Sequence, residues 1–130
     1  MRAPDIKTWS FWKNVLLWAL SLLLAAGHLL QAALPKLTGA EWVVEQFSQF
    51  GYSPGFRVLI GVVEAVGALL LLWPRAAAWG AVVLGVVMIG AIYSHVATDL
   101  GSPWHPTRNL VLLALIAWGR WGQTLRLGDT

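Results

Sequence analysis

A single carboxylate inside an apolar segment is the residue of this chain with the clearest chemical potential. Glu64 lies in Val58–Trp73, where every other residue is apolar or glycine. In a bilayer-spanning helix, an ionisable side chain costs on the order of 3 kcal/mol and usually faces a partner, a ligand or an ion pathway. Glu64 is therefore the first candidate for a functional residue. A buried carboxylate that only holds helices together is the alternative.

Two histidines fall at a depth similar to that of Glu64. At about 1.5 Å per residue, Glu64 lies about 10 Å beyond Arg57, if Arg57 marks the outer interface. His28 lies about 12 Å from Lys36, if Lys36 marks the same surface. His95 lies about 6 Å inside the end of its own segment. We therefore expect three titratable side chains from three helices in the outer half of one bundle.

Helical spacing also places these groups on shared faces. Three stripes recur at three- and four-residue steps, and turning them inward would bury the polar groups together. The stripes are Leu17, Ser21, Leu24, His28 and Gln31; Gly61, Glu64 and Ala68; and Met88, Ala91, Ile92, His95 and Asp99. With Asn109 at a similar depth, the predicted ligand-binding set is Glu64, His28, His95, Gln31 and Asn109.

The chemistry of this set suits a lipophilic ligand with a polar head. A quinone headgroup needs a proton donor or acceptor inside an apolar pocket, and Glu64 with His28 or His95 could supply one. A haem held between His28 and His95 is an alternative, because two histidines from two helices can serve as axial ligands. No metal site and no catalytic residue is predicted.

The composition defines the elements that must hold these residues. The 130 residues are 58% hydrophobic and 12% charged, with a mean hydropathy of +0.66. Val15–Leu34 has 20 residues without formal charge, and Ala76–Ala97 has 22 in which only His95 could be charged. A helix of about 20 such residues spans the hydrocarbon core of a bilayer. The chain is therefore predicted to be an integral membrane protein.

We expect an all-α fold with a single membrane domain over residues 1–130, built as a four-helix bundle. The predicted helices cover about 13–34, 56–73, 76–99 and 107–122. The first should end before Pro35, because the residue preceding a proline avoids the helical region. Its apolar run is longer than the core of a cleaved signal peptide, which is the alternative.

A short amphipathic helix is expected over 38–50, lying on the bilayer surface between the first two helices. Thr38 is its candidate N-cap, with Glu41 three residues later. Residues 51–55 are expected to form a turn. The fourth helix is the shortest, and it spans only if Arg108 and Arg120 reach opposite surfaces. A re-entrant segment is the alternative there.

The distribution of basic residues predicts the orientation. Four crossings put both termini on one side, with six Lys and Arg residues there against three on the other. This bias favours cytoplasmic termini. Most of the nine tryptophans lie at predicted helix ends, as in interfacial belts.

Several motifs resemble the DoxX-like family of small membrane proteins. They are Lys36-Leu37-Thr38-Gly39, residues 51–57, Gly61-x-x-Glu64-x-x-Gly67-Ala68, Pro74-Arg75 and Met88-x-Gly90-Ala91 followed by His95. The resemblance implies a four-helix bundle in the bacterial inner membrane, with Glu64 and His95 at recurrent polar positions. The family name comes from subunits of a thiosulfate:quinone oxidoreductase, and other relatives are linked to oxidative-stress complexes. The absence of cysteine here argues against sulfur oxidation.

Three functions follow as hypotheses. The first is a quinone- or lipophile-binding subunit associated with a membrane oxidoreductase. The second is an accessory or assembly protein that contacts partner helices through Ala77-x-x-x-Ala81-x-x-x-Gly85. The third is a small solute or proton carrier that works as a homo-oligomer. The bilayer is the expected surrounding, and nucleic acid is not an expected partner because the basic residues form no patch.

Overall fold

The computed structural model describes residues 6–123 of the chain, and the described part is helical without strands. This confirms the all-α class. The elements are α1 (Ile6–Gly27), the π-helix η1 (His28–Ala33), α2 (Leu34–Thr38), α3 (Glu41–Phe50), α4 (Pro54–Leu71), α5 (Ala77–Thr98), α6 (Trp104–Arg120) and a 3-10 turn, η2 (Trp121–Gln123).

Within the described residues, three helical segments are long and apolar enough to cross a membrane. They are Ser10–Thr38, Pro54–Leu71 and Ala77–Thr98. With 17 residues, α6 is shorter than these three spans. Three spans are therefore supported by length and composition. The fourth crossing stays a prediction, with the re-entrant segment as its alternative.

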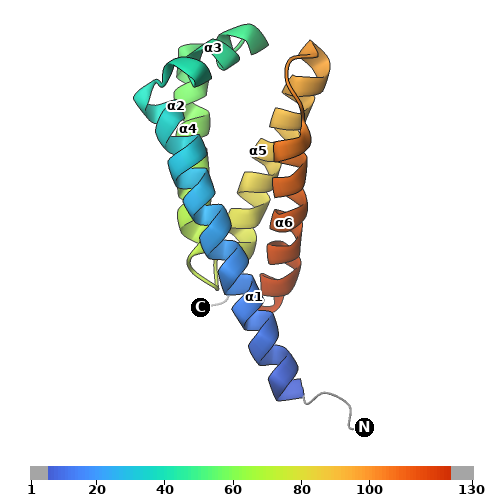
Figure 1. Ribbon diagram of the computed structural model, residues 1–130. Coiled ribbons are helices and arrows are strands. Elements are labelled where there is room, and N and C mark those ends of the chain that lie inside the picture. The colour runs from blue at the N-terminus through green and yellow to red at the C-terminus, as the bar shows by residue number, and fades with distance from the viewer. Residues whose placement is uncertain (1–5, 124–130) are drawn as a thin grey trace.

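The helices form two arms that diverge from a common base (Figure 1). One arm holds the α1–η1–α2 rod with α4, and the other holds α5 with α6. The arms meet near the α4–α5 connection, and α3 lies across the wide end. The core fills the base and consists of Leu24, Ala25, Ala68, Leu71, Ala77, Ala81, Leu84, Met88, Leu113 and Ile116.

Close approach of α4 and α5 at the base depends on two glycines. A Cβ at Gly80 would lie 2.7 Å from the Gly67 carbonyl oxygen, and a Cβ at Gly67 would lie 2.8 Å from Leu84 Cγ. Both distances are far shorter than a non-bonded contact allows. Glycine at these positions therefore lets the two backbones pack directly against each other.

The first helix does not end before Pro35, so that prediction was wrong. The α1–η1–α2 rod continues to Thr38 and stops at Gly39, whose φ of 74° is left-handed. Leu34 still donates to the carbonyl of Leu29, five residues back. In η1 each amide bonds to the carbonyl five residues back, and in α2 to the carbonyl four residues back. Pro35 has no N–H, so the hydrogen-bond pattern can change at this residue without leaving an amide unbonded.

The ends of the next two helices also differ from expectation. Thr38 is not an N-cap, because it closes α2 and its hydroxyl donates to the Leu34 carbonyl. Pro54 begins α4 instead of lying in a turn, since proline fits the first turn of a helix. The Ser53 hydroxyl caps α4 by accepting from the amide of Phe56. The amphipathic segment 38–50 is confirmed in part, as the helix α3.

At the C-terminal side, α5 matches the predicted 76–99 within one residue at each end. The last helix begins at Trp104, three residues earlier than predicted. Pro106 does not prevent this, because the first-turn amides of a helix lack intrahelical partners. The position of Arg120 relative to a membrane surface stays a prediction. Arg120 is 2% exposed and donates to Asn14.

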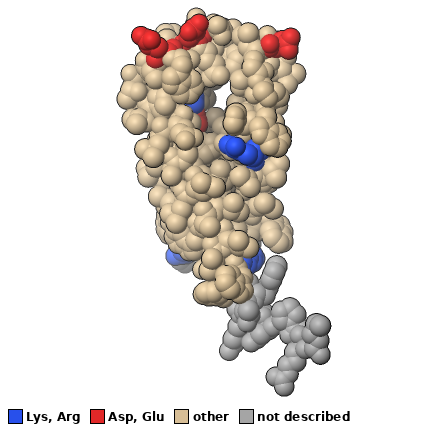
Figure 2. All heavy atoms as spheres, viewed as in Figure 1, with Lys and Arg blue, Asp and Glu red and all other residues tan. Residues whose placement is uncertain are grey.

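Acidic side chains gather at the wide end of the molecule, where α3 and the end of α5 carry them (Figure 2). Glu41, Glu45 and Asp99 are the exposed acidic residues of these segments. Below α3 the surface is hollowed between the arms, and charged atoms are visible on the wall of the hollow (Figure 2). The polar site lies in this region.

Candidate functional site

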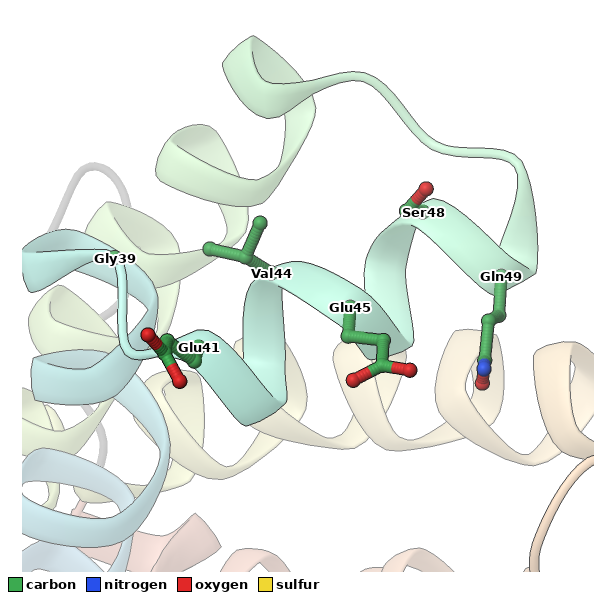
Figure 3. A pocket seen from close by; sticks show the side chains of 6 residues that line it. All are labelled: Gly39, Glu41, Val44, Glu45, Ser48 and Gln49. Carbon is green, nitrogen blue, oxygen red and sulfur yellow. The ribbon is translucent and has the colours of Figure 1, made fainter.

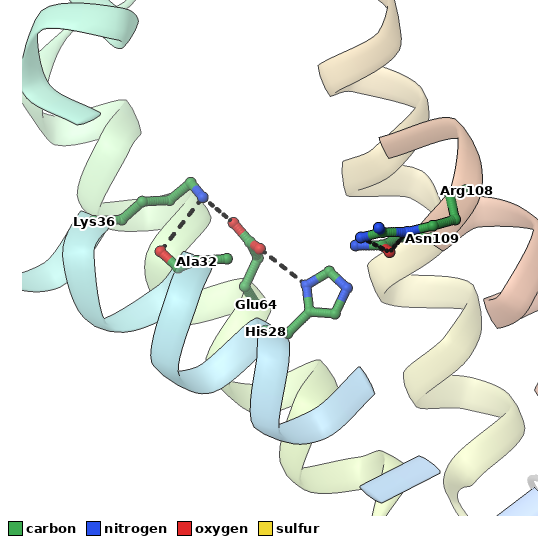
Figure 4. A network of polar contacts seen from close by, with 6 residues as sticks. All are labelled: His28, Ala32, Lys36, Glu64, Arg108 and Asn109. Atoms are coloured by element: carbon green, nitrogen blue, oxygen red, sulfur yellow. Dashed lines mark hydrogen bonds and ion pairs between the residues drawn. The ribbon is translucent and has the colours of Figure 1, made fainter. Parts of the chain in front are cut away.

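The Glu64 carboxylate is fully buried and is held by two nitrogen groups (Figure 4). Its Oε1 lies 2.7 Å from Nζ of Lys36, and its Oε2 lies 3.2 Å from Nδ1 of His28. Glu64 comes from α4, His28 from η1 and Lys36 from α2. We refer to His28, Lys36 and Glu64 as the polar triad. The structure thus brings together Glu64 and His28, as the helical stripes predicted.

The π-helix explains why both nitrogen groups reach one carboxylate. In a regular α-helix, eight residues at about 100° each would leave Lys36 about 80° away from His28. A π-helix bonds each residue to one five positions away, so each residue turns the chain by a smaller angle. Over the six residues of η1, these smaller angles remove most of the angle of about 80° between Lys36 and His28. His28 and Lys36 therefore face α4 together.

The same change of rotation moves Gln31 out of the site. Gln31 would lie about 60° from His28 in an α-helix, but the wider π turn carries it further round. Its side chain is exposed. The stripe prediction holds for Leu17, Ser21, Leu24 and His28, which are all buried, and is wrong for Gln31.

Lys36 does not mark the membrane surface, contrary to the assumption used for depth. Its side chain is 14% exposed and turns inward to Glu64. Nζ also lies 3.4 Å from the Ala32 carbonyl and 5.9 Å from the centre of the Phe47 ring. The guanidinium of Arg57 donates to the backbone carbonyl of Lys36. These contacts fix the ammonium group beside the carboxylate.

The second ring nitrogen of His28 is buried and has no hydrogen-bond partner among the described residues. It points toward the side of the site where α6 carries Arg108 and Asn109 (Figure 4). Asn109 is half-buried and accepts two bonds of 3.3 Å from the Arg108 side chain. Asn109 therefore lies on the facing side of the site but makes no recorded contact with the polar triad.

A cavity of about 540 Å³ adjoins Glu64 and Lys36. Residues of α3, α4 and α5 provide nearly all of its wall, and most of them are apolar. The lining residues are Lys36, Gln46, Phe47, Phe50, Tyr52, Phe56, Ile60, Val63, Glu64, Val82, Val83, Val86, Val87, Met88, Gly90, Ala91, Ser94 and His95. Ligand pockets usually have this character, with a few polar groups placed in an apolar wall.

His95 borders this cavity but does not join the polar triad. Its Nδ1 lies 2.6 Å from the Leu100 carbonyl oxygen, and its ring packs edge-on to Phe50 with centroids 5.1 Å apart. A carbonyl can only accept, so Nδ1 carries the proton in this bond. In the neutral ring, Nε2 is then a hydrogen-bond acceptor. The predicted convergence of His95 with Glu64 is therefore limited to a shared cavity.

Two further lining residues were missed by the sequence analysis. The hydroxyl groups of Tyr52 and Ser94 lie 2.6 Å apart, and Ser94 also donates to the Gly90 carbonyl over 2.8 Å. Ser94 is 5% exposed. The Gly-Tyr turn at 51–52 was noted only as a motif. A serine inside an apolar helix gives a weak signal, because it can bond to its own backbone.

A second depression lies on the outer surface of α3 (Figure 3). Gly39, Glu41, Val44, Glu45, Ser48 and Gln49 line it, and none of them lines the cavity beside Glu64. Its charged residues are exposed. We therefore assign the candidate site to the inner cavity.

The two histidines do not line one cavity, as a haem bridged between them would require. Their Nδ1 atoms lie beside Glu64 and the Leu100 carbonyl, so Nε2 is the remaining nitrogen of each ring. The cavity is lined by His95 and not by His28. Among the described residues, no group of three His, Cys, Asp or Glu side chains is placed to hold a metal ion.

The family model described as the DoxX-like family matches residues 19–119. The uncharacterized protein YwoB of Bacillus subtilis is 33% identical over 69 residues, which are 53% of this chain and 45% of YwoB. The chain therefore spans less than half the length of this relative. No solved structure matches it.

The matched residues 19–119 include the polar triad, the lining of the cavity and all three candidate membrane spans except the start of the first. The Gly-x-x-Glu-x-x-Gly-Ala motif, on which the resemblance was based, surrounds the buried carboxylate at the centre of the site. The chain is a membrane protein and belongs to the DoxX-like family.

Proposed function

We propose that the protein binds a lipophilic molecule in the cavity between α3, α4 and α5, with the polar head of that molecule beside Lys36 and Glu64. The observation that carries the proposal is a mostly apolar cavity of about 540 Å³ with a buried carboxylate and ammonium pair in its wall. An apolar tail would contact the valine and phenylalanine side chains. The head would contact the few polar groups.

Within this class, a quinone headgroup fits the available donors and acceptors. A lysine ammonium group has three N–H donors, and Lys36 directs two toward Glu64 and Ala32. The third can donate to a carbonyl oxygen of the ring. Nε2 of His95 can accept from a hydroxyl group of the reduced ring. Reduction and oxidation of a quinone need groups in the site that donate and accept protons.

This function places the chain beside a membrane oxidoreductase as a quinone-binding subunit. We propose the bacterial plasma membrane as its location, with cytoplasmic termini. The motivation is the DoxX-like family assignment together with the predicted charge bias of the loops. A homo-oligomeric carrier is the remaining alternative, and flux through vesicles that depends on Glu64 would favour it.

The accessory-protein hypothesis required that the stripe Ala77-x-x-x-Ala81-x-x-x-Gly85 be exposed to a partner helix. Ala77 is fully buried, Ala81 is 2% exposed and Gly85 is buried. A Cβ at Gly85 would meet Leu110 of α6 at 3.6 Å. This small-residue stripe packs within the chain, so it is not available to a partner helix.

Filling the cavity tests the proposal directly. Gly90 lines the cavity, and a Cβ at this position would have no atom within 4 Å. The Cβ of Gly90→Leu therefore meets no other atom, the rest of its side chain adds apolar volume at the cavity wall, and the change favours the helix by about 1 kcal/mol. We expect the dissociation constant of an isoprenoid quinone to rise at least about tenfold, which is about 1.4 kcal/mol.

Gly27→Leu is the matched control, because Gly27 is also a helical glycine with open space around its Cβ and does not line the cavity. It should bind quinone like the unmodified protein. Binding is measured by calorimetry in detergent, and native mass spectrometry reports lipids that the purified protein retains. Equal affinity in both variants would exclude this cavity as the site. Absence of both retained lipid and saturable quinone binding would end the proposal.

A further inference from the structure

Part of the cavity wall is also part of the outer surface of the bundle. Val86 is 64% exposed, Val82 is 43% exposed and Phe56 is 39% exposed, and all three line the cavity. Gly90 also lines the cavity and is exposed, and a Cβ at this position would have no atom within 4 Å. These residues lie on α4 and α5, which are both apolar enough to span a membrane. The cavity therefore borders the surface that acyl chains cover.

The wide end of the molecule is closed by contrast. Here α3 lies across the gap between the arms (Figure 1), and the hollow seen in Figure 2 lies beneath it. Phe47 of α3 is 8% exposed and seals one part. The Phe50 ring packs on His95 of α5, and the Tyr52 hydroxyl bonds to Ser94 of α5. We call α3 with Phe50 and Tyr52 the roof.

The outer surface of the roof has a different character from the cavity below. It carries the exposed acidic residues Glu41 and Glu45, and its depression shares no lining residue with the inner cavity. A water-borne molecule would meet this polar surface first. A bilayer lipid would meet the valines and the open position at Gly90.

We infer that the cavity exchanges its ligand sideways with the bilayer, between α4 and α5, and that the roof separates it from the aqueous phase. The inference rests on the proposed function and names its ligand class, a membrane-resident lipid with a hydrocarbon tail. In this arrangement the tail remains among acyl chains while the head moves to Lys36 and Glu64.

The absence of cysteine makes the route measurable without any ligand. Val63 is half-buried and lines the cavity, so Val63→Cys places one thiol inside it with little change in size. Leu69→Cys, at a position 57% exposed on α4, is the reference for a thiol that faces lipid. Ser48→Cys, on the exposed surface of α3, is the reference for a thiol that faces water.

The variants are reconstituted in phosphatidylethanolamine and phosphatidylglycerol vesicles and labelled with two maleimides. A maleimide dissolved in the bilayer should modify Val63→Cys at a rate similar to that of Leu69→Cys. A charged, impermeant maleimide should modify Val63→Cys more than about tenfold more slowly than Ser48→Cys, because a charge is costly in an apolar region. Equal rates of charged labelling at Val63→Cys and Ser48→Cys would overturn the inference.

Gly90→Cys provides a second thiol in the cavity if Val63→Cys does not fold, and the same two comparisons apply to it. Because labelling needs no ligand, its outcome is separate from the outcome of quinone binding. If the charged maleimide modifies Val63→Cys slowly but the protein binds no lipid, the proposed function is contradicted and the sideways opening is kept. If the charged maleimide modifies Val63→Cys quickly and the protein binds quinone, the sideways opening is contradicted and the proposed function is kept.

Discussion

At the scale of residues, the polar triad balances its own charges inside an apolar helix pair. Glu64 contributes a negative charge and Lys36 a positive one, and their atoms are 2.7 Å apart. His28 places its Nδ1 3.2 Å from the second carboxylate oxygen. Removal of one member of a buried ion pair costs about 3–5 kcal/mol, because the remaining charge has no partner. Neutral replacement of both members costs much less.

This balance predicts the behaviour of single and double variants. Glu64→Gln should lower the unfolding temperature in detergent markedly, since it leaves the Lys36 ammonium group without its carboxylate. Glu64→Gln combined with Lys36→Met should recover most of the loss, because both charges are removed together. Thermal unfolding followed by circular dichroism measures the effect. A double variant as unstable as Glu64→Gln alone would show that the pair is not the cause.

The same pair of variants separates stability from binding. The double variant should regain stability but not quinone affinity, because the donor and the carboxylate of the site are both absent. A triad that only holds the helices together would behave differently: quinone affinity would then follow stability. The comparison therefore decides between the functional and the purely structural interpretation of Glu64.

How far these residues could be predicted depends on how regular their helices are. The contact between Glu64 and His28 was predicted, because each lies on an inward stripe of a helix. Lys36 was taken for an interfacial residue, since a lysine after a proline resembles the end of a helix. Gln31 was placed in the site by three-residue spacing. The wider turn of η1 carries Gln31 away from the site and brings Lys36 toward the carboxylate, and neither effect follows from α-helical spacing.

At the scale of elements, η1 acts as one extra residue inserted into the first membrane span. A π-helix of this kind contains about one residue more than the α-helix it interrupts, and such segments often occur at functional sites. The extra residue brings Lys36 into phase with His28 while α1 keeps its packing. Periodicity alone could not reveal it, because every stripe was drawn at α-helical spacing.

Deletion of one residue from η1 should therefore be tolerated. Leu30 lies in η1 and is 65% exposed. Its deletion lets the segment become α-helical, and seven residues at about 100° keep Lys36 within about 20° of His28. Deletion of Leu22, 54% exposed in the regular helix α1, instead rotates the preceding stripe by about 100°. Leu17 and Ser21 would then leave the core.

We expect the Leu30 deletion to unfold at a temperature close to that of the unmodified protein, and the Leu22 deletion to unfold at a much lower one. Both variants lose one exposed leucine, so loss of apolar surface cannot explain a difference. Equal destabilisation would mean that η1 is not an inserted residue in an otherwise continuous helix.

At the scale of the whole molecule, the base is tightly packed, whereas the arms diverge toward the wide end and leave a cavity beneath the roof. The base depends on direct backbone contact at Gly67 and Gly80. The divergence of the arms was not predictable from the sequence. Stripes of residues show which faces turn inward, but they do not show how far apart two helices lie along their length.

The charges at the two ends of the molecule predict its orientation in the membrane. The roof carries Glu41 and Glu45, and the α4–α5 connection at the base carries Arg75. Cytoplasmic connections usually contain the excess of Lys and Arg. The base is therefore predicted to face the cytoplasm and the roof the opposite side.

Single cysteines test this orientation, since the chain has none of its own. In intact bacterial cells, Ser48→Cys on the roof should react with an impermeant maleimide, and Arg75→Cys at the base should not. After the cells are opened, Arg75→Cys should react as well, because Arg75 is exposed. Labelling of Arg75→Cys alone in intact cells would place the roof in the cytoplasm. The aqueous phase above the roof would then be the cytoplasmic one.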